Sequence, residues 1–138
     1  MSAPVELVQG VPLFEGLNQR ELRDLASTMK ERTFREGQTI AVEGQSGIGF
    51  FIIAEGTATV SQGGEDRATL GPGDHFGEIA LIDDGVRTAS VTAASQLKAY
   101  GLTSWEFRPL VESNATIAWK LLKTMATRLR EAERRPAG

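Results

Sequence analysis

One carboxylate and one guanidinium occur in a short glycine-containing segment of this 138-residue chain. The segment comprises Phe76-Gly77-Glu78-Ile79-Ala80-Leu81 and, after an acidic loop, Arg87-Thr88-Ala89-Ser90-Val91. Gly77 permits the backbone to approach a ligand closely, and the next residues should form one helical turn. The first amides of such a turn are unpaired and attract anions. This chemistry suits a small phosphate ester that also carries a free hydroxyl.

Arg87 and Glu78 should bind different parts of such a ligand. The guanidinium of Arg87 offers paired donors in a planar fork that matches two phosphate oxygens. Thr88 adds a hydroxyl and Ala89 an amide beside it. Glu78 would repel a phosphate, but a carboxylate is a good acceptor for a ribose hydroxyl. The two charged residues therefore describe a ligand with a phosphate and a 2′-hydroxyl close together.

Helices are expected before and after this segment. Asn18 and Glu21 have the spacing of a capping box, which predicts a helix that continues to about residue 30. Thr103 can cap a short helix through residue 111, and Asn114 can cap a final helix that reaches about residue 133. These helices would flank the central segment of the chain, residues 31–102.

The last predicted helix has an apolar face and a basic end. Ile117, Leu121, Met125 and Leu129 recur every four residues, so this face should pack against the rest of the protein. Its C-terminal arginines are interpreted as a solvated helix end, where positive charge suits the helix dipole. They are Arg128, Arg130, Arg134 and Arg135.

Short β-type runs separated by glycines fill the middle of the chain, from residue 33 to residue 100. Many short strands with glycine between them indicate an antiparallel barrel or sandwich. The predicted fold is mainly β with flanking helices. It is an antiparallel β jelly-roll barrel with an N-terminal helical segment, a short helix in the phosphate-binding segment and C-terminal helices. We expect a single domain over residues 1–138, with helices in 5–30, the β-roll in 31–102 and the C-terminal helices in 103–133.

Composition and charge restrict the environment and the partners. The net charge of −3 gives no general attraction to polyanions, so nucleic acid is not an expected partner of this chain alone. No cysteine is present, so neither disulfides nor a thiolate nucleophile can form. No apolar run approaches the roughly 20 residues that cross a bilayer, and no secretion signal is recognisable. A cytoplasmic protein without membrane contact is expected.

The glycine-containing segment resembles the phosphate-binding cassette of the cyclic nucleotide-binding domain family. This family occurs in bacterial catabolite activator proteins, protein kinase regulatory subunits and cyclic-nucleotide-gated channels. Its cassette has the pattern F-G-E-[LI]-A-L, a variable loop and R-[TSA]-A-[ST]-V, and this chain fills every position. The resemblance covers most of residues 10–132. It implies a ligand site that consists of Gly77, Glu78, Ile79, Ala80, Arg87, Thr88 and Ala89.

The resemblance also implies a role for each part of the site. Glu78 and the Gly77 amide would hold the ribose 2′-hydroxyl. Arg87, the Ala80 amide and the segment 88–89 would hold the cyclic phosphate. The favoured ligand is cAMP, and cGMP is permitted because a threonine at position 88 can touch a guanine ring. No separate cofactor is expected, and binding should move the last helix over the base as a lid.

Catalysis is not indicated, although several non-catalytic roles stay open. Metal-dependent jelly-roll enzymes bind their metal through several histidines, whereas this chain has only His75, interpreted as a surface or structural residue. No serine has an evident catalytic base. The chain could be a stand-alone sensor that acts on an effector protein or as a homodimer. It could also be the ligand-binding domain of a larger transcription factor or effector, or a degenerate domain that serves protein–protein interaction.

Overall fold

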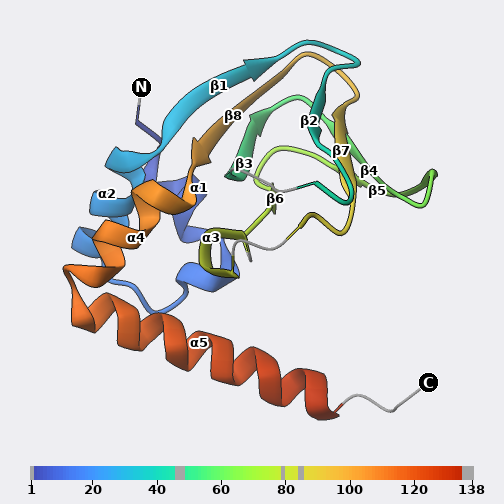
Figure 1. The fold of residues 1–138 in the computed structure, drawn as a ribbon. Helices are drawn as coiled ribbons and strands as arrows, with labels where there is room; N and C mark the ends of the chain where they lie inside the picture. Colours follow the sequence, from blue (N-terminus) through green and yellow to red (C-terminus); the bar gives the residue numbers. More distant parts are fainter. Residues whose placement is uncertain (1, 46–48, 79, 84–85, 135–138) are drawn as a thin grey trace.

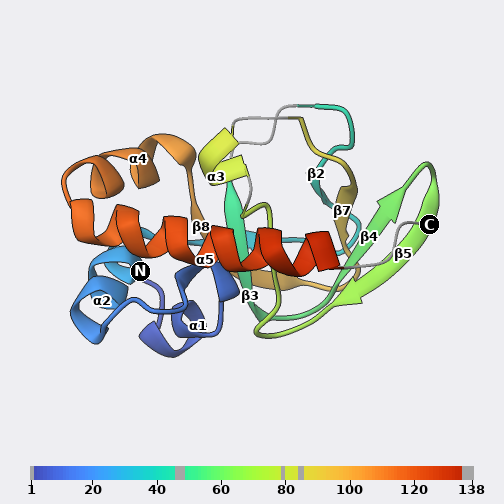
Figure 2. The same cartoon turned by 90° about the horizontal axis from the view of Figure 1, so that it is seen from below.

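The computed structural model of this chain describes residues 2–45, 49–78, 80–83 and 86–134. Figure 1 shows a β-roll with a group of helices beside it, and the long helix α5 (Ala115–Arg134) runs beneath both. The view from below in Figure 2 shows that α5 starts next to α4 (Ser104–Glu112) and extends toward the β-roll. None of the helices in the described part of the chain has the length and apolar character that a membrane span requires.

The β-roll consists of two four-stranded antiparallel sheets, with the strand orders β1-β8-β3-β6 and β2-β7-β4-β5. The first sheet contains β1 (Lys30–Phe34), β8 (Leu97–Leu102), β3 (Phe50–Glu55) and β6 (His75–Phe76). The second contains β2 (Thr39–Ala41), β7 (Ser90–Ala93), β4 (Ala58–Gln62) and β5 (Glu65–Leu70). The predicted mainly β fold with flanking helices is confirmed. Within the described residues the two sheets stay separate, so the roll is open rather than a closed barrel.

Small and branched apolar side chains fill the interior of the β-roll. They are Ala41, Ile53, Ala58, Val91, Ala93, Leu97 and Ala99. Buried and less buried residues alternate along β7, as the period of a strand requires. The turn before β4 brings Gly56 against the backbone of residues 96 and 97, where a Cβ has no room, and its φ of +88° also favours glycine.

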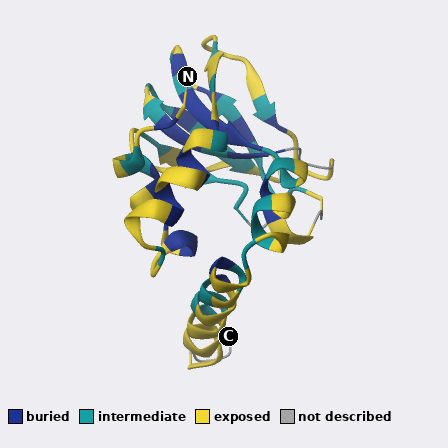
Figure 3. Cartoon of the chain, turned by 90° about the vertical axis from the view of Figure 1, so that its left-hand side faces the viewer, coloured by how far each residue is buried: buried dark blue, intermediate teal, exposed yellow. Residues whose placement is uncertain are grey.

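A second core joins the helices to β3 and β8. It lies between α1 (Val5–Gln9), η1 (Pro12–Phe14), α2 (Gln19–Thr28), α4 and the first half of α5. The ring of Phe14 stands edge-on to that of Phe50, with centroids 5.8 Å apart, which joins η1 to the first sheet. Figure 3 shows buried residues where the helices meet the sheets, whereas most of α5 beyond its first turns is exposed.

The predicted helix starts are confirmed. Asn18 accepts a hydrogen bond from the Glu21 amide (2.9 Å), and the Glu21 carboxylate accepts one from the Asn18 amide (2.8 Å). Thr103 forms the corresponding capping box at the start of α4. Asn114 accepts from the Ile117 amide (3.2 Å) at the start of α5. These caps satisfy amides that a helix leaves unpaired, so the sequence defines where each helix begins.

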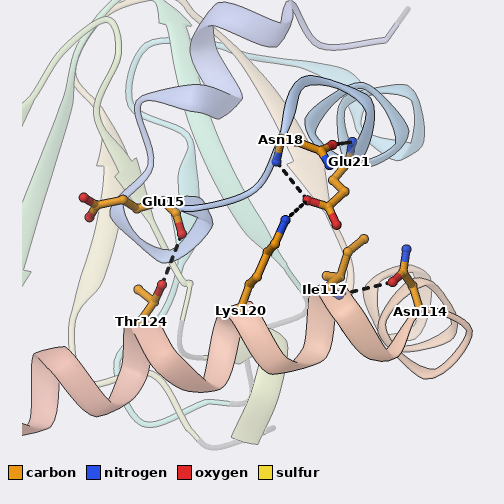
Figure 4. Close-up of polar contacts among 7 residues, drawn as sticks. All are labelled: Glu15, Asn18, Glu21, Asn114, Ile117, Lys120 and Thr124. Carbon is orange, nitrogen blue, oxygen red and sulfur yellow. Dashed lines mark hydrogen bonds and ion pairs between the residues drawn. The ribbon is translucent and has the colours of Figure 1, made fainter.

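Two polar contacts fix α5 to the N-terminal helices, as Figure 4 shows. Lys120 Nζ lies 2.7 Å from Oε1 of Glu21, and the Thr124 hydroxyl donates to the Glu15 carbonyl (3.2 Å). Glu21 is buried although it is charged. The hydrogen bond from Lys120 lowers the pKa of the Glu21 carboxyl, and the hydrogen bond with the Asn18 backbone acts in the same direction.

Replacing Lys120 with methionine should therefore destabilise the fold at neutral pH. The expected loss is about 1 to 2 kcal/mol, between the values typical of exposed and buried ion pairs. Because the folded-state pKa of Glu21 is lowered, this contribution is present above the unfolded pKa of glutamate, about 4.3, and disappears as the pH falls through the folded pKa. Urea unfolding of both proteins from pH 7 to pH 3.5 measures it. Arg23→Met, at an exposed position of α2, is the control. Equal stability of the parent and Lys120→Met at pH 7 would contradict the assignment.

Candidate functional site

A pocket of about 400 Å³ lies beside β6 and the short helix α3 (Ala80–Asp83). Its lining includes six predicted site residues: Gly77, Glu78, Ala80, Arg87, Thr88 and Ala89. The remaining predicted residue, Ile79, lies outside the described residues. The other lining side chains are Ala41, Val60, His75, Phe76, Asp83, Val86 and Val91. The fold thus brings both halves of the predicted segment around one cavity.

Gly77 has a specific structural reason to be glycine. Its φ is +84°, and a Cβ at this position would collide with the guanidinium of Arg87 and with the Gly49 carbonyl. The sequence pattern suggests that a ligand approaches the backbone here. The structure shows that the guanidinium of Arg87 and the carbonyl of Gly49 are the immediate neighbours of this glycine.

Arg87 is held in place and still has a donor to offer. Its Nη2 donates to the Gly49 carbonyl. Its Nε is buried and has no hydrogen-bond partner among the described residues. Burial lowers the pKa of the guanidinium, but a guanidinium stays charged at neutral pH. A half-buried cation with an unused donor is suited to an incoming anion.

Glu78 is bound from two sides. Its Oε1 lies 2.9 Å from Nη2 of Arg128 on α5, and its Oε2 lies 3.8 Å from Nδ1 of His75. The Glu78 side chain is only 12% exposed. Oε2 accepts no hydrogen bond from any described residue. Arg128 therefore orients the carboxylate and leaves one oxygen available for a donor.

Arg128 and His75 are the site residues that sequence reasoning missed. The interpretation of Arg128 as part of a solvated helix end is wrong, because its guanidinium reaches across to the pocket carboxylate. One signal could have identified it: Lys120, Thr124 and Arg128 are spaced four residues apart and lie on one face of α5. His75 immediately precedes the cassette, but a lone histidine carries no pattern that reveals its neighbour.

A larger pocket, of about 630 Å³, lies between α3, α4 and α5 and has a different character. Its lining is mostly apolar and includes Leu81, Phe107 and Leu121. Its charged lining residues within the described part of the chain are Arg108 and Glu112, which pair with each other at 3.3 Å. The unpaired guanidinium donor expected of a phosphate site is found in the smaller pocket, on Arg87. Among the described residues no group of histidine, aspartate and glutamate side chains is arranged to hold a metal ion.

An open β-roll that carries a helix-flanked polar pocket defines a small-ligand-binding domain. The chain belongs to the cyclic nucleotide-binding domain family, since the sequence pattern of the family described as "Cyclic nucleotide-binding domain" matches residues 31–114. This match covers both sheets, the whole pocket and the start of the C-terminal helices.

Two curated relatives illustrate the range of the family. The chain is 33% identical over 131 residues to the cyclic AMP receptor protein of Thermus thermophilus, covering 91% of this chain and 61% of that protein. It is 35% identical over 123 residues to a cyclic nucleotide-gated potassium channel of Mesorhizobium japonicum, covering 89% of this chain and 34% of the channel. The chain thus spans less than two thirds of the length of either relative.

Solved structures agree with the fold. The N-terminal domain of a transcriptional regulator from Streptomyces coelicolor superimposes with a TM-score of 0.85 at 29% identity, over 96% of this chain and 99% of that one. The catabolite activator protein of Thermus thermophilus gives a TM-score of 0.71 at 33% identity, over 89% of this chain and 60% of that one. The relatives described here are receptors, channels and regulators rather than enzymes.

Proposed function

We propose that this chain binds a cyclic nucleotide, cAMP in preference to cGMP, as a cytoplasmic, non-catalytic sensor domain. One observation carries the proposal: Glu78 and Arg87 line the same pocket, and each keeps a buried polar atom without a hydrogen-bond partner among the described residues. A buried acceptor and a buried donor are costly unless a ligand satisfies them. A cyclic nucleotide offers a ribose hydroxyl to the first and an anionic phosphate to the second.

Each part of the ligand has a proposed partner. Oε2 of Glu78 and the Gly77 amide bind the ribose 2′-hydroxyl. Arg87, the Ala80 amide and the segment 88–89 bind the cyclic phosphate. Ile79 belongs to the same proposed segment but lies outside the described residues. The preference for cAMP is supported by the cyclic AMP receptor protein of Thermus thermophilus, which is 33% identical to this chain.

Titration calorimetry with cAMP and then cGMP tests the proposal, on protein first shown to contain no co-purified nucleotide. Micromolar or tighter binding of either nucleotide is the expected result, with cAMP the tighter. If an emptied site binds neither nucleotide, the sensor function is wrong and the degenerate protein-interaction domain is favoured instead. The curated relatives are longer than this chain, so the alternative is a ligand-binding domain within a larger transcription factor or effector. Determining whether the coding sequence continues into a DNA-binding or effector domain tests this alternative.

Arg128 provides the proposed route from the site to the effector. It links the pocket carboxylate to α5, whose other side-chain contacts with distant elements of the described chain are at Lys120 and Thr124. A ligand that draws Glu78 inward therefore acts on the far half of α5. Such a response is a shift between two populations, driven by the difference in nucleotide affinity between them.

Hydrogen exchange should reveal this coupling. We expect cAMP to slow exchange in residues 76–90 and to alter it in residues 115–132. In Arg128→Met the protection of residues 76–90 should persist while the response of α5 falls sharply, because the connecting ion pair is gone. Arg134→Met, at an exposed position of the same helix, is the control. Unchanged exchange in α5 of the parent would remove the lid mechanism.

The outer face of α5 supports a homodimer. Trp119, Leu122 and Leu129 are 63%, 61% and 60% exposed, and Ala126 lies between the last two. The expectation that Leu129 packs against the rest of the protein is therefore wrong, because the packed face of α5 ends at Met125. Their spacing of three and four residues is that of the seam of a coiled coil. We propose that a second copy of this chain covers this seam.

The charges beside the seam favour a parallel pair. Lys123 and Arg130 occupy one flank, and Ala118 and Met125 occupy the other. In a parallel pair each flank faces the opposite flank of the partner, so cations face apolar residues. In an antiparallel pair like flanks meet, and cation faces cation.

Light scattering after size exclusion measures this association. The parent at tens of micromolar should be dimeric. Leu122→Glu should be monomeric, because the free energy needed to bury a carboxylate in the seam exceeds the free energy of association. Trp105→Glu, on α4 and equally exposed, should leave the dimer intact. A monomeric parent at that concentration would exclude the homodimer and leave an effector protein as the partner.

A further inference from the structure

His75 lines the pocket next to the carboxylate of Glu78. It lies on β6, and its ring packs against the ring of Phe50 with centroids 5.9 Å apart. Its Nδ1 is 3.8 Å from Oε2 of Glu78, too far for a hydrogen bond. Both atoms are buried without a hydrogen-bond partner among the described residues. Two polar atoms thus face each other across a gap that a small movement would close.

The charges around His75 can be assigned from every neighbouring element. The charged residues that line the pocket or touch Glu78 within the described chain are Glu78 itself, Asp83 on α3, Arg87 and Arg128 on α5. Strand β3 presents the apolar Phe50 and Ile52 to His75. Asp74 does not line the pocket, and its carboxylate accepts from the Gly71 amide (2.8 Å). Among the described residues, two carboxylates and two guanidinium groups thus surround His75.

An anionic ligand changes this balance. The cyclic phosphate brings one additional negative charge into a partly buried site, where charges interact more strongly than in water. Histidine is the side chain that changes charge between about pH 5 and pH 8. A proton on His75 would offset the added negative charge and turn Nδ1 into a donor toward Oε2 of Glu78.

We propose that His75 is a positioning residue of the nucleotide site and that nucleotide binding is coupled to its protonation. Protonated His75 donates from Nδ1 to Oε2 of Glu78 and holds the carboxylate toward the ribose hydroxyl. The inference rests on the proposed cyclic nucleotide binding. By linkage, binding takes up a proton, so the affinity rises as the pH falls from 8 to 6.

Calorimetry of the full chain with cAMP at pH 6, 7 and 8 tests this coupling. Each pH is measured in two buffers of different ionisation enthalpy, which counts the protons exchanged. The expected Kd at pH 6 is roughly 3- to 10-fold lower than at pH 8, with net proton uptake at pH 7. His75 is the only histidine, so no other imidazole contributes.

Two variants test whether His75 is the group that takes up the proton. His75→Asn places a non-titrating amide near the position of Nδ1, and His75→Phe keeps a ring against Phe50 should the first variant fold poorly. Both should bind cAMP with little pH dependence and no uptake. Asp74→Asn, the control at the adjacent titrating residue, should behave as the parent.

Each other outcome is decisive. Binding of cAMP without proton uptake would overturn the role of His75 and leave the sensor function standing. Uptake that persists in both histidine variants would place the proton on another group and also overturn it. Absence of binding at every pH would refute the proposed function, and the coupling with it.

Discussion

Replacement of Arg87 by alanine should weaken cAMP binding by about 2 to 5 kcal/mol, the range for removing one partner of a buried charged contact. This corresponds to a rise in Kd of about 30- to 4,000-fold. The physical reason is that the phosphate anion would enter a partly buried pocket and lose the cation that faces it. Calorimetry or competition with a fluorescent cyclic nucleotide measures the change.

The structure dictates the controls for this variant. Arg87 also donates to the Gly49 carbonyl, so circular dichroism and thermal unfolding must show that Arg87→Ala remains folded. Arg87→Lys keeps the charge but loses the planar fork, and it should recover only part of the affinity. If Arg87→Ala binds cAMP as tightly as the parent, the phosphate is held elsewhere and the proposed site is wrong.

Replacement of Glu78 by glutamine should weaken cAMP binding by about 1.5 to 3 kcal/mol, the usual range for a hydrogen bond to a charged group. The same change should remove most of the discrimination against 2′-deoxy-cAMP, because the carboxylate is the proposed acceptor for the missing hydroxyl. Measuring both ligands on both proteins gives a cycle that isolates this one contact.

Arg128 provides a matched control for the Glu78 variant. Glu78→Gln also breaks the ion pair with Arg128, so part of its effect could come from α5. Arg128→Met breaks the same ion pair but keeps the carboxylate. It should retain discrimination against the 2′-deoxy ligand. Full discrimination in Glu78→Gln would instead remove Glu78 from the ribose role.

Much of the fold is determined by local patterns in the sequence. The capping residues Asn18, Thr103 and Asn114 predict where three helices begin, and each makes its predicted hydrogen bond. Short β runs between glycines predict the β-roll. These predictions succeed because each depends on neighbours a few residues away. The predicted division into one domain over residues 1–138, with its internal boundaries, stays a prediction.

The position of the candidate site, like much of the fold, was predicted from the sequence. Glu78 and Arg87 are found in one pocket. The expectation that Arg87 binds a phosphate and Glu78 a hydroxyl came from side-chain chemistry and stays a prediction. Ile79 is outside the described residues. The roles of all the predicted site residues are proposals, and the two substitutions above examine those of Arg87 and Glu78.

The sequence by itself determined the types of element, the helix starts and the chemistry available at the cassette, because these depend on residue identity and short spacing. Only the tertiary structure decided what Glu78 touches. Arg128 follows it by 50 residues in the chain, and His75 faces it through the turn at Gly77. His75 is only three residues from Glu78, but residue types alone do not show that the turn at Gly77 brings the two side chains together. The contact with Arg128 exists only after α5 has packed its apolar face beneath the N-terminal helices, and no short spacing relates positions 78 and 128. That packing converts an apparently solvated arginine into a link between the ligand pocket and the longest helix of the protein.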